Sequence, residues 1–547
     1  MMGKVAVAGI SLILVVGVII GVVATVSRSG GSTTSQTDSK SGISTGMKAV
    51  ETLCAPADYR DVCMKTLAPV AQKNSNATPK DLVEATFEAT LQTVMEAFNQ
   101  AGTIKFDDKD LLEKNNMEAC KELMQYAEHE LRSALRKLSD VEMHTLGELG
   151  ADLKNWLSAV MAYSSDCVEF IQAPQLKKDM ENLLVNTTQL TYNTLAIVDE
   201  VSKILNKINM TIPSSFTNSR RLLNVELDND EYPTWVSASD RKLLAARNNN
   251  LRPNAVVAKD GSGQFNSIQA AVNAYPKNHQ GRYIIYVKAG IYNEIVEIPN
   301  KAVNVFIYGD GPRKTIVTVG DGFIAKSMAF RNTAGPMGEQ AVALRVNSEG
   351  AVIYNCRIDG YQDTLYYHAK RQFYRNCVIS GTVDFIFGHG TAVIQNSQII
   401  LRLGKLSSQN TITADGRQDA RVNSGVVLQN CRILPEKRLV PRLPGFASYF
   451  GRPWKAYART MVMESEIPAA IRPEGWLPFN GNSFDKTCEY REYANRGPGA
   501  LANRRVNWSK VITDRRAAEA YTVGGMLREV IPAIRGGAVP VLLGLTR

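Results

Sequence analysis

The stretch Asn355-Cys-Arg-Ile-Asp-Gly-Tyr-Gln-Asp363 recurs 21 residues later as Asn376-Cys-Val-Ile-Ser-Gly-Thr-Val-Asp384. Asn, Cys, Ile, Gly and Asp occupy the same places in both copies, and related fragments contain Asn332, Asn396 and Asn430. A repeat of this length is typical of repeat architectures. The surrounding residues form short β-branched and aromatic runs without a helical period. The repeat therefore predicts a parallel β-helix in which each copy forms one coil.

Stacked coils bring equivalent residues of successive copies together, about 4.8 Å apart. For Cys356 and Cys377 this spacing predicts a disulfide. Asp363 and Asp384 also become neighbours, and two adjacent carboxylates cannot both ionise easily, so one pKa should rise. Such a split supplies an acid together with a nucleophile or base. The alternative is that both aspartates cap solvated turns, but their aromatic, largely uncharged sequence surroundings favour the catalytic interpretation.

The first half of the chain has a helical period instead. Residues 48–206 carry apolar stripes at helical spacing, which predict an antiparallel four-helix bundle. Thr78 followed by Pro79 indicates a helix start, with Thr as N-cap. This region holds no C-x-x-C pair, so its four cysteines are better explained by disulfides than by zinc. The expected disulfides are Cys54–Cys63 and Cys120–Cys167.

The N-terminal segment predicts export. Residues 5–26 form an uncharged apolar run between Lys4 and Arg28, long enough to cross a bilayer core of about 30 Å. We interpret residues 1–28 as an uncleaved signal-anchor, the alternative being a long cleavable signal peptide. Residues 29–47 read as a flexible Ser/Thr/Gly-rich stalk. Beyond them lie four possible glycosylation sites, at Asn76, Asn186, Asn209 and Asn507.

A polar linker, residues 207–250, separates the two halves. It contains Arg220-Arg-Leu-Leu223 and Arg241-Lys-Leu-Leu244. Dibasic sites in an exposed linker are accessible to proteases, which makes Arg221 and Lys242 candidate processing sites. The alternative is a solvated linker that is never cut.

The composition and charge of the chain restrict the classes of molecule that it can bind. The chain has 547 residues, is 44% hydrophobic and 21% charged, and carries a formal charge of +10. These values exclude a disordered or wholly membrane-embedded chain, and the basic balance favours an anionic partner. Nucleic acid is a poor fit, because the basic residues are scattered and export removes the partner. The five histidines form no H-E-x-x-H motif, so we expect no metal and no cofactor.

Several blocks of the second half, occurring in order over residues 251–525, resemble the signature blocks of plant pectin methylesterases. The helical half, with its four cysteines, resembles the inhibitor-like pro-region of the longer plant forms, and the two dibasic tetrapeptides resemble the processing sites between the two. The matching blocks are 256–263, 290–294, 340–345, Tyr361-Gln-Asp-Thr-Leu-Tyr366, Gly381-Thr-Val-Asp-Phe-Ile-Phe-Gly388 and Gly451-Arg-Pro-Trp454.

This resemblance implies that residues 251–547 form a right-handed parallel β-helix that hydrolyses the methyl esters of homogalacturonan in the cell wall. It implies that Asp384 is the nucleophile and that Asp363 protonates the departing methanol and then activates water. Gln340 and Gln362 are implied to stabilise the oxyanion. Two further residues follow the same blocks: Arg452, which is implied to hold Asp384 ionised, and Trp454, which is implied to stack on a sugar ring. The implied partners are pectin, the chain's own inhibitor-like half and a processing protease.

Three positions depart from the family pattern. After Thr318 the chain lacks about twenty residues, roughly one coil, that include a substrate-binding threonine, so we expect lower activity than with the coil restored. Gly320 and Gly322 are expected to absorb the resulting turn, with Val319 and Phe323 in the core. His389 replaces a common asparagine. Ser397 replaces a frequent cysteine, which leaves Cys431 unpaired unless Cys488 reaches it.

Two other functions compete with an active esterase. One is a weakly active or inactive relative that acts as an inhibitor or as a pectin-binding wall protein, and methanol release from methylated pectin separates it from the esterase. The other is a chain-cutting β-helix enzyme such as a polygalacturonase or pectate lyase, since paired carboxylates also serve glycosidases. The two glutamines and the Arg452-Pro-Trp454 block argue against chain cutting.

Overall fold

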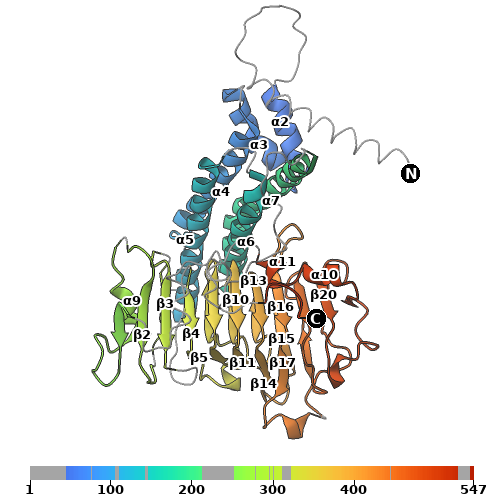
Figure 1. Cartoon of the computed structure of the whole chain (residues 1–547). Coiled ribbons are helices and arrows are strands. Elements are labelled where there is room, and N and C mark those ends of the chain that lie inside the picture. The colour runs from blue at the N-terminus through green and yellow to red at the C-terminus, as the bar shows by residue number, and fades with distance from the viewer. Residues whose placement is uncertain are drawn as a thin grey trace, which may run out of the picture. The chain divides into compact units, whose positions relative to one another are not determined.

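The computed structural model describes residues 45–546 except 75–76, 105–109, 142–145, 212–251, 278, 293, 295, 300, 311–321, 444 and 528–541. The chain divides into two compact units, residues 1–218 and 219–547. Helices fill the described part of the first unit and parallel strands dominate the second (Figure 1).

The first unit is a four-helix bundle preceded by a helical hairpin. In the bundle α4 packs on α5 and α7, and α6 packs on α5 and α7, which closes the ring. Thr78 caps α4: its hydroxyl accepts from Asp81 N, and Asp81 Oδ2 accepts from Thr78 N, so the predicted helix start is confirmed. The hairpin consists of α2 (Thr45–Cys54) and α3 (Arg60–Lys73), and the bundle of α4 (Pro79–Ala101), α5 (Leu111–Ser139), α6 (Leu146–Phe170) and α7 (Pro174–Thr211).

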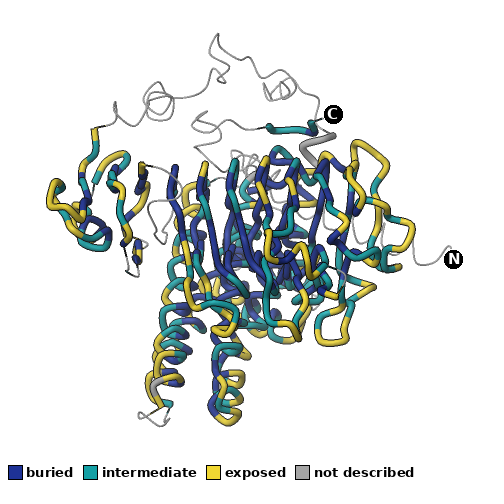
Figure 2. The backbone as a smooth tube through the Cα atoms, turned by 90° about the horizontal axis from the view of Figure 1, so that it is seen from below, coloured by how far each residue is buried: buried dark blue, intermediate teal, exposed yellow. Residues whose placement is uncertain are grey.

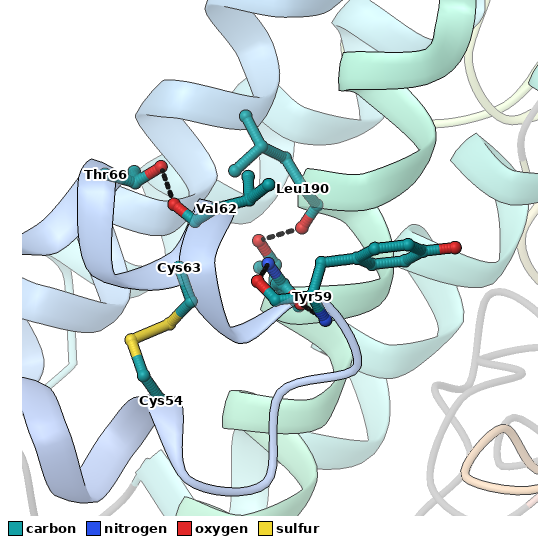
Figure 3. The surroundings of a disulfide bond; sticks show 8 residues. Cys54, Tyr59, Val62, Cys63, Thr66 and Leu190 are labelled. Carbon is teal, nitrogen blue, oxygen red and sulfur yellow. Dashed lines mark hydrogen bonds between the residues drawn. A yellow bond between two sulfur atoms is a disulfide. The ribbon is translucent and has the colours of Figure 1, made fainter.

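Two disulfides brace this unit. Cys54 is bonded to Cys63 and Cys120 to Cys167, the pairs that the sequence predicts. The first closes the turn between α2 and α3 (Figure 3). Beside it the backbone of Tyr59 is held by Asn193 of α7, which accepts from Tyr59 N at 2.8 Å and donates to Tyr59 O at 2.9 Å. The hairpin is thereby attached to the bundle.

The second unit is a parallel β-helix with three sheets. Its long sheet runs in the order β1-β2-β3-β4-β7-β10-β13-β16-β19-β20-β21, and two five-stranded sheets run β17-β14-β11-β8-β5 and β18-β15-β12-β9-β6. All pairings between named strands are parallel. Most strands are buried along much of their length (Figure 2). The described part of this unit also contains the short helices α9 (Ile268–Asn273), α10 (Arg515–Glu519) and α11 (Val523–Met526).

The strand bounds are as follows. The long sheet contains β1 (Ala255–Val257), β2 (Tyr283–Val287), β3 (Val305–Gly309), β4 (Ile324–Lys326), β7 (Ala351–Tyr354), β10 (Arg371–Arg375), β13 (Thr391–Gln395), β16 (Gly425–Gln429), β19 (Arg459–Met463), β20 (Glu489–Tyr493) and β21 (Ser509–Val511). The second sheet contains β5 (Ala329–Arg331), β8 (Arg357–Asp359), β11 (Val378–Gly381), β14 (Gln398–Leu401) and β17 (Arg432–Pro435). The third contains β6 (Leu344–Asn347), β9 (Leu365–Ala369), β12 (Ile386–Gly388), β15 (Asn410–Asp415) and β18 (Ser448–Gly451).

The sequence repeat marks a corner of the coil. Asn355, Asn376, Asn396 and Asn430 each have φ between 51° and 54°, a left-handed conformation that Asn tolerates better than most residues. Asn396 Nδ2 donates to Asn376 Oδ1 at 2.6 Å, so the ladder also bonds along the helix axis. Inside the corner, buried isoleucines stack in register: Ile358, Ile379, Ile399 and Ile433.

Asn332 does not belong to this ladder. The equivalent position in its coil is Ser327, which has φ 56° and whose hydroxyl accepts from Asn355 Nδ2 at 3.0 Å. Asn332 follows β5 and pairs with the chain after Asp359. The assignment of Asn332 to the repeat was wrong. The fragment around Asn332 that resembles the repeat is only three residues long, which is too short to fix the position of Asn332 in the coil.

The predicted disulfide between Cys356 and Cys377 is not formed, although the two residues stack as the repeat predicts. Both are buried thiols, and the adjacent main chains bond through Val378 N and Cys356 O at 2.9 Å. In-register parallel neighbours keep their Cβ atoms near the strand spacing of about 4.8 Å, whereas a disulfide requires about 3.5–4.5 Å. Cys431 and Cys488 are also thiols.

We expect thiol titration to find four free cysteines once the unreduced protein is unfolded. In the native protein Cys377 and Cys431 should react slowly, because burial raises the pKa of each thiol to about 12 and suppresses the reactive thiolate. The measurement is titration with an aromatic disulfide reagent before and after denaturation. Two thiols instead of four would restore a disulfide in the β-helix.

The coils on either side of the missing segment stack directly. β3 pairs with β4, matching Phe306 to Ile324, and β4 continues to β7. Phe323 is fully buried in the core, and Gly322 has φ +65°, where a Cβ would lie 2.6 Å from Asn304 Oδ1. The sequence predicts Phe323 in the core and Gly322 in the turn, and both positions are confirmed. Val319 and Gly320 lie outside the described residues.

The remaining predicted features are only partly covered by the structure. Among the described residues no helix is both long and apolar enough to span a bilayer. The predicted anchor, residues 29–44 of the predicted stalk, Asn76, Arg221 and Lys242 lie outside the described residues, and Asn209 lies within α7. The last residues of the predicted stalk, 45–47, belong to α2, and the first residues of the predicted linker, 207–211, belong to α7. Asn186 and Asn507 are exposed, as a glycosylation acceptor requires.

Candidate active site

Asp363 and Asp384 lie at equivalent places in adjacent coils, each just before a strand of the third sheet. Asp363 precedes β9 and Asp384 precedes β12, and the pairing of Leu365 with Ile386 fixes this register. Asp363 N donates to Val383 O at 3.0 Å. Both aspartates have positive φ, 59° and 48°, a conformation uncommon in non-glycine residues and more tolerated by Asp than by most. The structure thus brings together the two carboxyl groups that the repeat pairs.

Asp384 is buried and held as a carboxylate by two side chains. Arg452 Nε lies 2.9 Å from Oδ1 and 3.1 Å from Oδ2, and Arg452 Nη2 donates to Oδ2 at 2.6 Å. Thr411 Oγ1 donates to Oδ1 at 2.7 Å and accepts from Asp384 N at 2.8 Å. Charge-assisted hydrogen bonds of this kind stabilise the ionised form.

Arg452 is in turn fixed from its other side. Its guanidinium lies over the ring of Phe479 with 4.5 Å to the centroid. Burial opposes its charge, but the hydrogen bonds with Asp384 prevail and raise the pKa of Arg452. The guanidinium therefore stays charged beside the carboxylate.

Asp363 has the opposite character. Burial, reinforced by the negative charge of Asp384 and partly opposed by Arg452, raises the pKa of Asp363 to about 8. At neutral pH Asp363 is therefore a protonated acid next to the arginine-bound Asp384. The sequence predicts that one of the two pKa values rises, and the pKa of Asp363 does so.

We expect kcat/KM for ester hydrolysis to fall above about pH 8. The raised pKa keeps the Asp363 proton in place below that pH, and the acid needed by the leaving group is lost as pH rises through it. The measurement is the initial rate on a methylated oligogalacturonide between pH 5 and 10, corrected for spontaneous hydrolysis. A rate that stays level to pH 9.5 would contradict the assigned role of Asp363.

The two glutamines also lie in adjacent coils. Gln340 pairs with Gln362, and Ala341 N donates to Gln362 O at 3.2 Å. Gln340 is exposed and Gln362 half-buried. Gln362 directly precedes Asp363, so both glutamines lie at the same end of the third sheet as the aspartates.

Trp454 belongs to an aromatic group on the third sheet. Its ring centroid lies 4.5 Å from that of His389 and 6.0 Å from that of Phe387, and Phe387 stacks on Tyr366 at 4.3 Å. His389 Nδ1 lies 2.6 Å from Gly416 O. A Cβ at Gly416 would come within 2.5 Å of His389 Nδ1 and 2.9 Å of Trp454 Cε3, so only glycine fits there. Trp454 itself is half-buried.

A polar recess of about 500 Å³ lies over the second sheet. Neither Asp363 nor Asp384 lines it. Tyr361, two residues before Asp363, forms part of its wall. Arg402 stacks on the Tyr361 ring at 3.9 Å and donates to Tyr361 OH and to Gly360 O. These contacts hold the turn that leads into Gln362 and Asp363.

Sequence reasoning did not assign Thr411, Phe479, Phe387 or Tyr366 to the site. Phe387 and Tyr366 lie in the blocks 381–388 and 361–366 that contain the two aspartates, so the sequence could have assigned them to the site. Thr411 follows Asp384 by 27 residues instead of 21 because the segment between β14 and β15 is longer than in the previous coil. Phe479 lies in a loop where no repeat applies.

The parallel β-helix thus carries two neighbouring aspartates, one protonated and one bound by an arginine. Paired carboxyl groups of this kind can supply an acid and a nucleophile for hydrolysis. The family model "Pectinesterase" matches residues 254–320 and 315–529, and the "Plant invertase/pectin methylesterase inhibitor" model matches residues 48–197. The chain belongs to the pectinesterase family and is a carboxylic ester hydrolase with an inhibitor-type helical region.

Individual relatives agree with this assignment. The chain is 41% identical to pectinesterase 4 of Arabidopsis thaliana, covering all of both chains. It is 39% identical to a probable pectinesterase/pectinesterase inhibitor of Brassica napus, covering 99% of this chain and all of the relative. Among solved structures, the pectin methylesterase from carrot is 42% identical with a TM-score of 0.52, and the match covers 54% of this chain and 99% of the carrot enzyme.

Proposed function

We propose that this chain hydrolyses the methyl esters of homogalacturonan, releasing methanol and leaving free carboxylates on the polymer. The observation that carries the proposal is the split pair: Asp384 bonded to Arg452 as a carboxylate, and Asp363 protonated because its pKa is raised to about 8. Family membership supplies the substrate class.

In the first half of the reaction Asp384 attacks the ester carbonyl carbon and forms a C–O bond. The carbonyl oxygen becomes an oxyanion, for which the amides of Gln340 and Gln362 are the proposed donors. Asp363 gives its proton to the methoxy oxygen as the C–O bond to methanol breaks. The products are methanol and an acyl-enzyme on Asp384.

In the second half Asp363, now ionised, takes a proton from water. The resulting hydroxide attacks the acyl carbon, and Asp384 leaves as a carboxylate. Asp363 is again protonated, so the cycle closes with one water consumed and one carboxylic acid formed. Arg452 favours Asp384 as the leaving carboxylate because it stabilises that charge.

For substrate binding we propose Trp454 as a stacking surface and Arg452 as a positive group near the reacting ester. The overall charge of +10 suits a polyanionic polymer. We further propose export to the cell wall, with residues 5–26 as signal-anchor and cleavage after Arg221 or Lys242 separating the inhibitor-like unit. The competing function is a weakly active relative that acts through that unit.

The test is to incubate the purified full chain with methylated polygalacturonate and to measure methanol and reducing ends together. Ester hydrolysis predicts methanol without new reducing ends. New reducing ends would indicate chain cutting. Neither product, combined with inhibition of an added active pectin methylesterase, would support the inhibitor function.

A further inference from the structure

Thr411 contacts Asp384 twice from the next coil. It lies in β15 and is 1% exposed. Asp384 N can only donate a hydrogen bond, so it occupies a lone pair of Thr411 Oγ1 at 2.8 Å. The ionised carboxylate can only accept, so the hydroxyl proton must point to Asp384 Oδ1, 2.7 Å away. The direction of this hydroxyl is therefore dictated by its two partners.

The neighbouring threonine on the same strand makes a useful comparison. Thr413 is equally buried, but its hydroxyl donates to a main-chain oxygen, Phe450 O, at 2.9 Å. A hydroxyl that only filled space or satisfied the backbone would resemble Thr413. Thr411 instead donates its hydroxyl hydrogen bond to Asp384, the proposed nucleophile.

Thr411 and Arg452 hold the carboxyl group of Asp384 between them. Arg452 Nε is shared by the two oxygens, at 2.9 Å from Oδ1 and 3.1 Å from Oδ2, and Arg452 Nη2 donates to Oδ2 at 2.6 Å. Thr411 Oγ1 donates to Oδ1 only. Thr411 therefore holds the carboxyl group on a different side from the guanidinium.

We propose that Thr411 is a positioning residue that holds the main chain and the carboxyl group of Asp384 in the orientation needed to attack the ester. This inference rests on the proposed function, because it requires Asp384 to be the nucleophile. By bonding both Asp384 N and Oδ1, Thr411 also fixes the left-handed backbone at φ 48° and the side-chain direction together. Such fixation places the nucleophile before substrate arrives.

The experiment compares Thr411→Val, which keeps the shape without the donor, with Thr411→Ser, which keeps the hydroxyl, in the full chain. We expect kcat of Thr411→Val to fall about ten- to a hundredfold with KM little changed. Thr411→Ser should recover most of the lost kcat. Thr391→Val is the matched control: Thr391 is buried in β13 and donates to Asn423 O, so its loss should change neither quantity.

Several results would overturn the inference. One is an unchanged kcat in folded Thr411→Val; another is Thr411→Ser as impaired as Thr411→Val. If thermal melting shows that the valine variant does not fold, Thr411→Ala replaces it with the same expectations. An active wild type with an inactive Asp384→Asn but an unaffected Thr411→Val overturns this inference alone. An inactive wild type overturns the proposed function and this inference with it.

Discussion

Asp384→Asn should lower methanol release by about a thousandfold or more, since catalytic nucleophiles typically contribute several orders of magnitude. The amide oxygen has almost the same shape but carries no negative charge, so it cannot form the acyl-enzyme. The measurement is kcat on methylated pectin, together with the melting temperature of the variant.

The fold should survive this substitution. Asn tolerates the φ of 48° at this position, and its amide oxygen still accepts from Arg452. Asp199→Asn is a matched control: Asp199 is a buried, ion-paired aspartate in the helical unit, held by Lys154 and Lys203, and its loss should leave kcat unchanged. Activity within tenfold of wild type in folded Asp384→Asn would place the nucleophile elsewhere.

Arg452→Gln should lower kcat by about a hundredfold or more, because removing one partner of a buried pair leaves an uncompensated charge that costs several kcal/mol. The measurement is kcat and KM of the variant and the wild type on methylated pectin, together with the melting temperature of each.

The control for Arg452 is another arginine in an ion pair of the β-helix. Arg371→Gln removes the partner of Glu349, a contact of 2.7 Å on the long sheet. We expect a loss of stability with kcat of the folded variant little changed. If Arg371→Gln and Arg452→Gln lower kcat equally, the effect of Arg452 is structural and its assigned role is wrong.

The repeat was a reliable guide to the fold because it reflects the coil itself. Four of its five asparagines occupy one left-handed corner and its isoleucines stack in the core, so period, register and the adjacency of Asp363 and Asp384 all follow from the sequence. The same register led to the wrong prediction of a disulfide between Cys356 and Cys377. Stacking sets the strand spacing but not the closer Cβ approach that a disulfide needs.

The remainder of the site depends on loops of irregular length. Thr411 follows Asp384 by 27 residues, whereas Asp384 follows Asp363 by 21, and a fixed period therefore does not find Thr411. Phe479 reaches Arg452 from a loop far along the chain. Contacts of this kind arise from how loops close on the third sheet, and a local sequence pattern carries no signal for them.

The most direct measurement follows methanol and protons together during turnover of methylated pectin by the purified full-length chain at constant pH. Hydrolysis of the ester through Asp384 and Asp363 predicts equal amounts of methanol and titrated acid. It also predicts a rate far above that of Asp384→Asn measured beside it. A wild-type rate no higher than that of the Asp384→Asn variant would contradict the account.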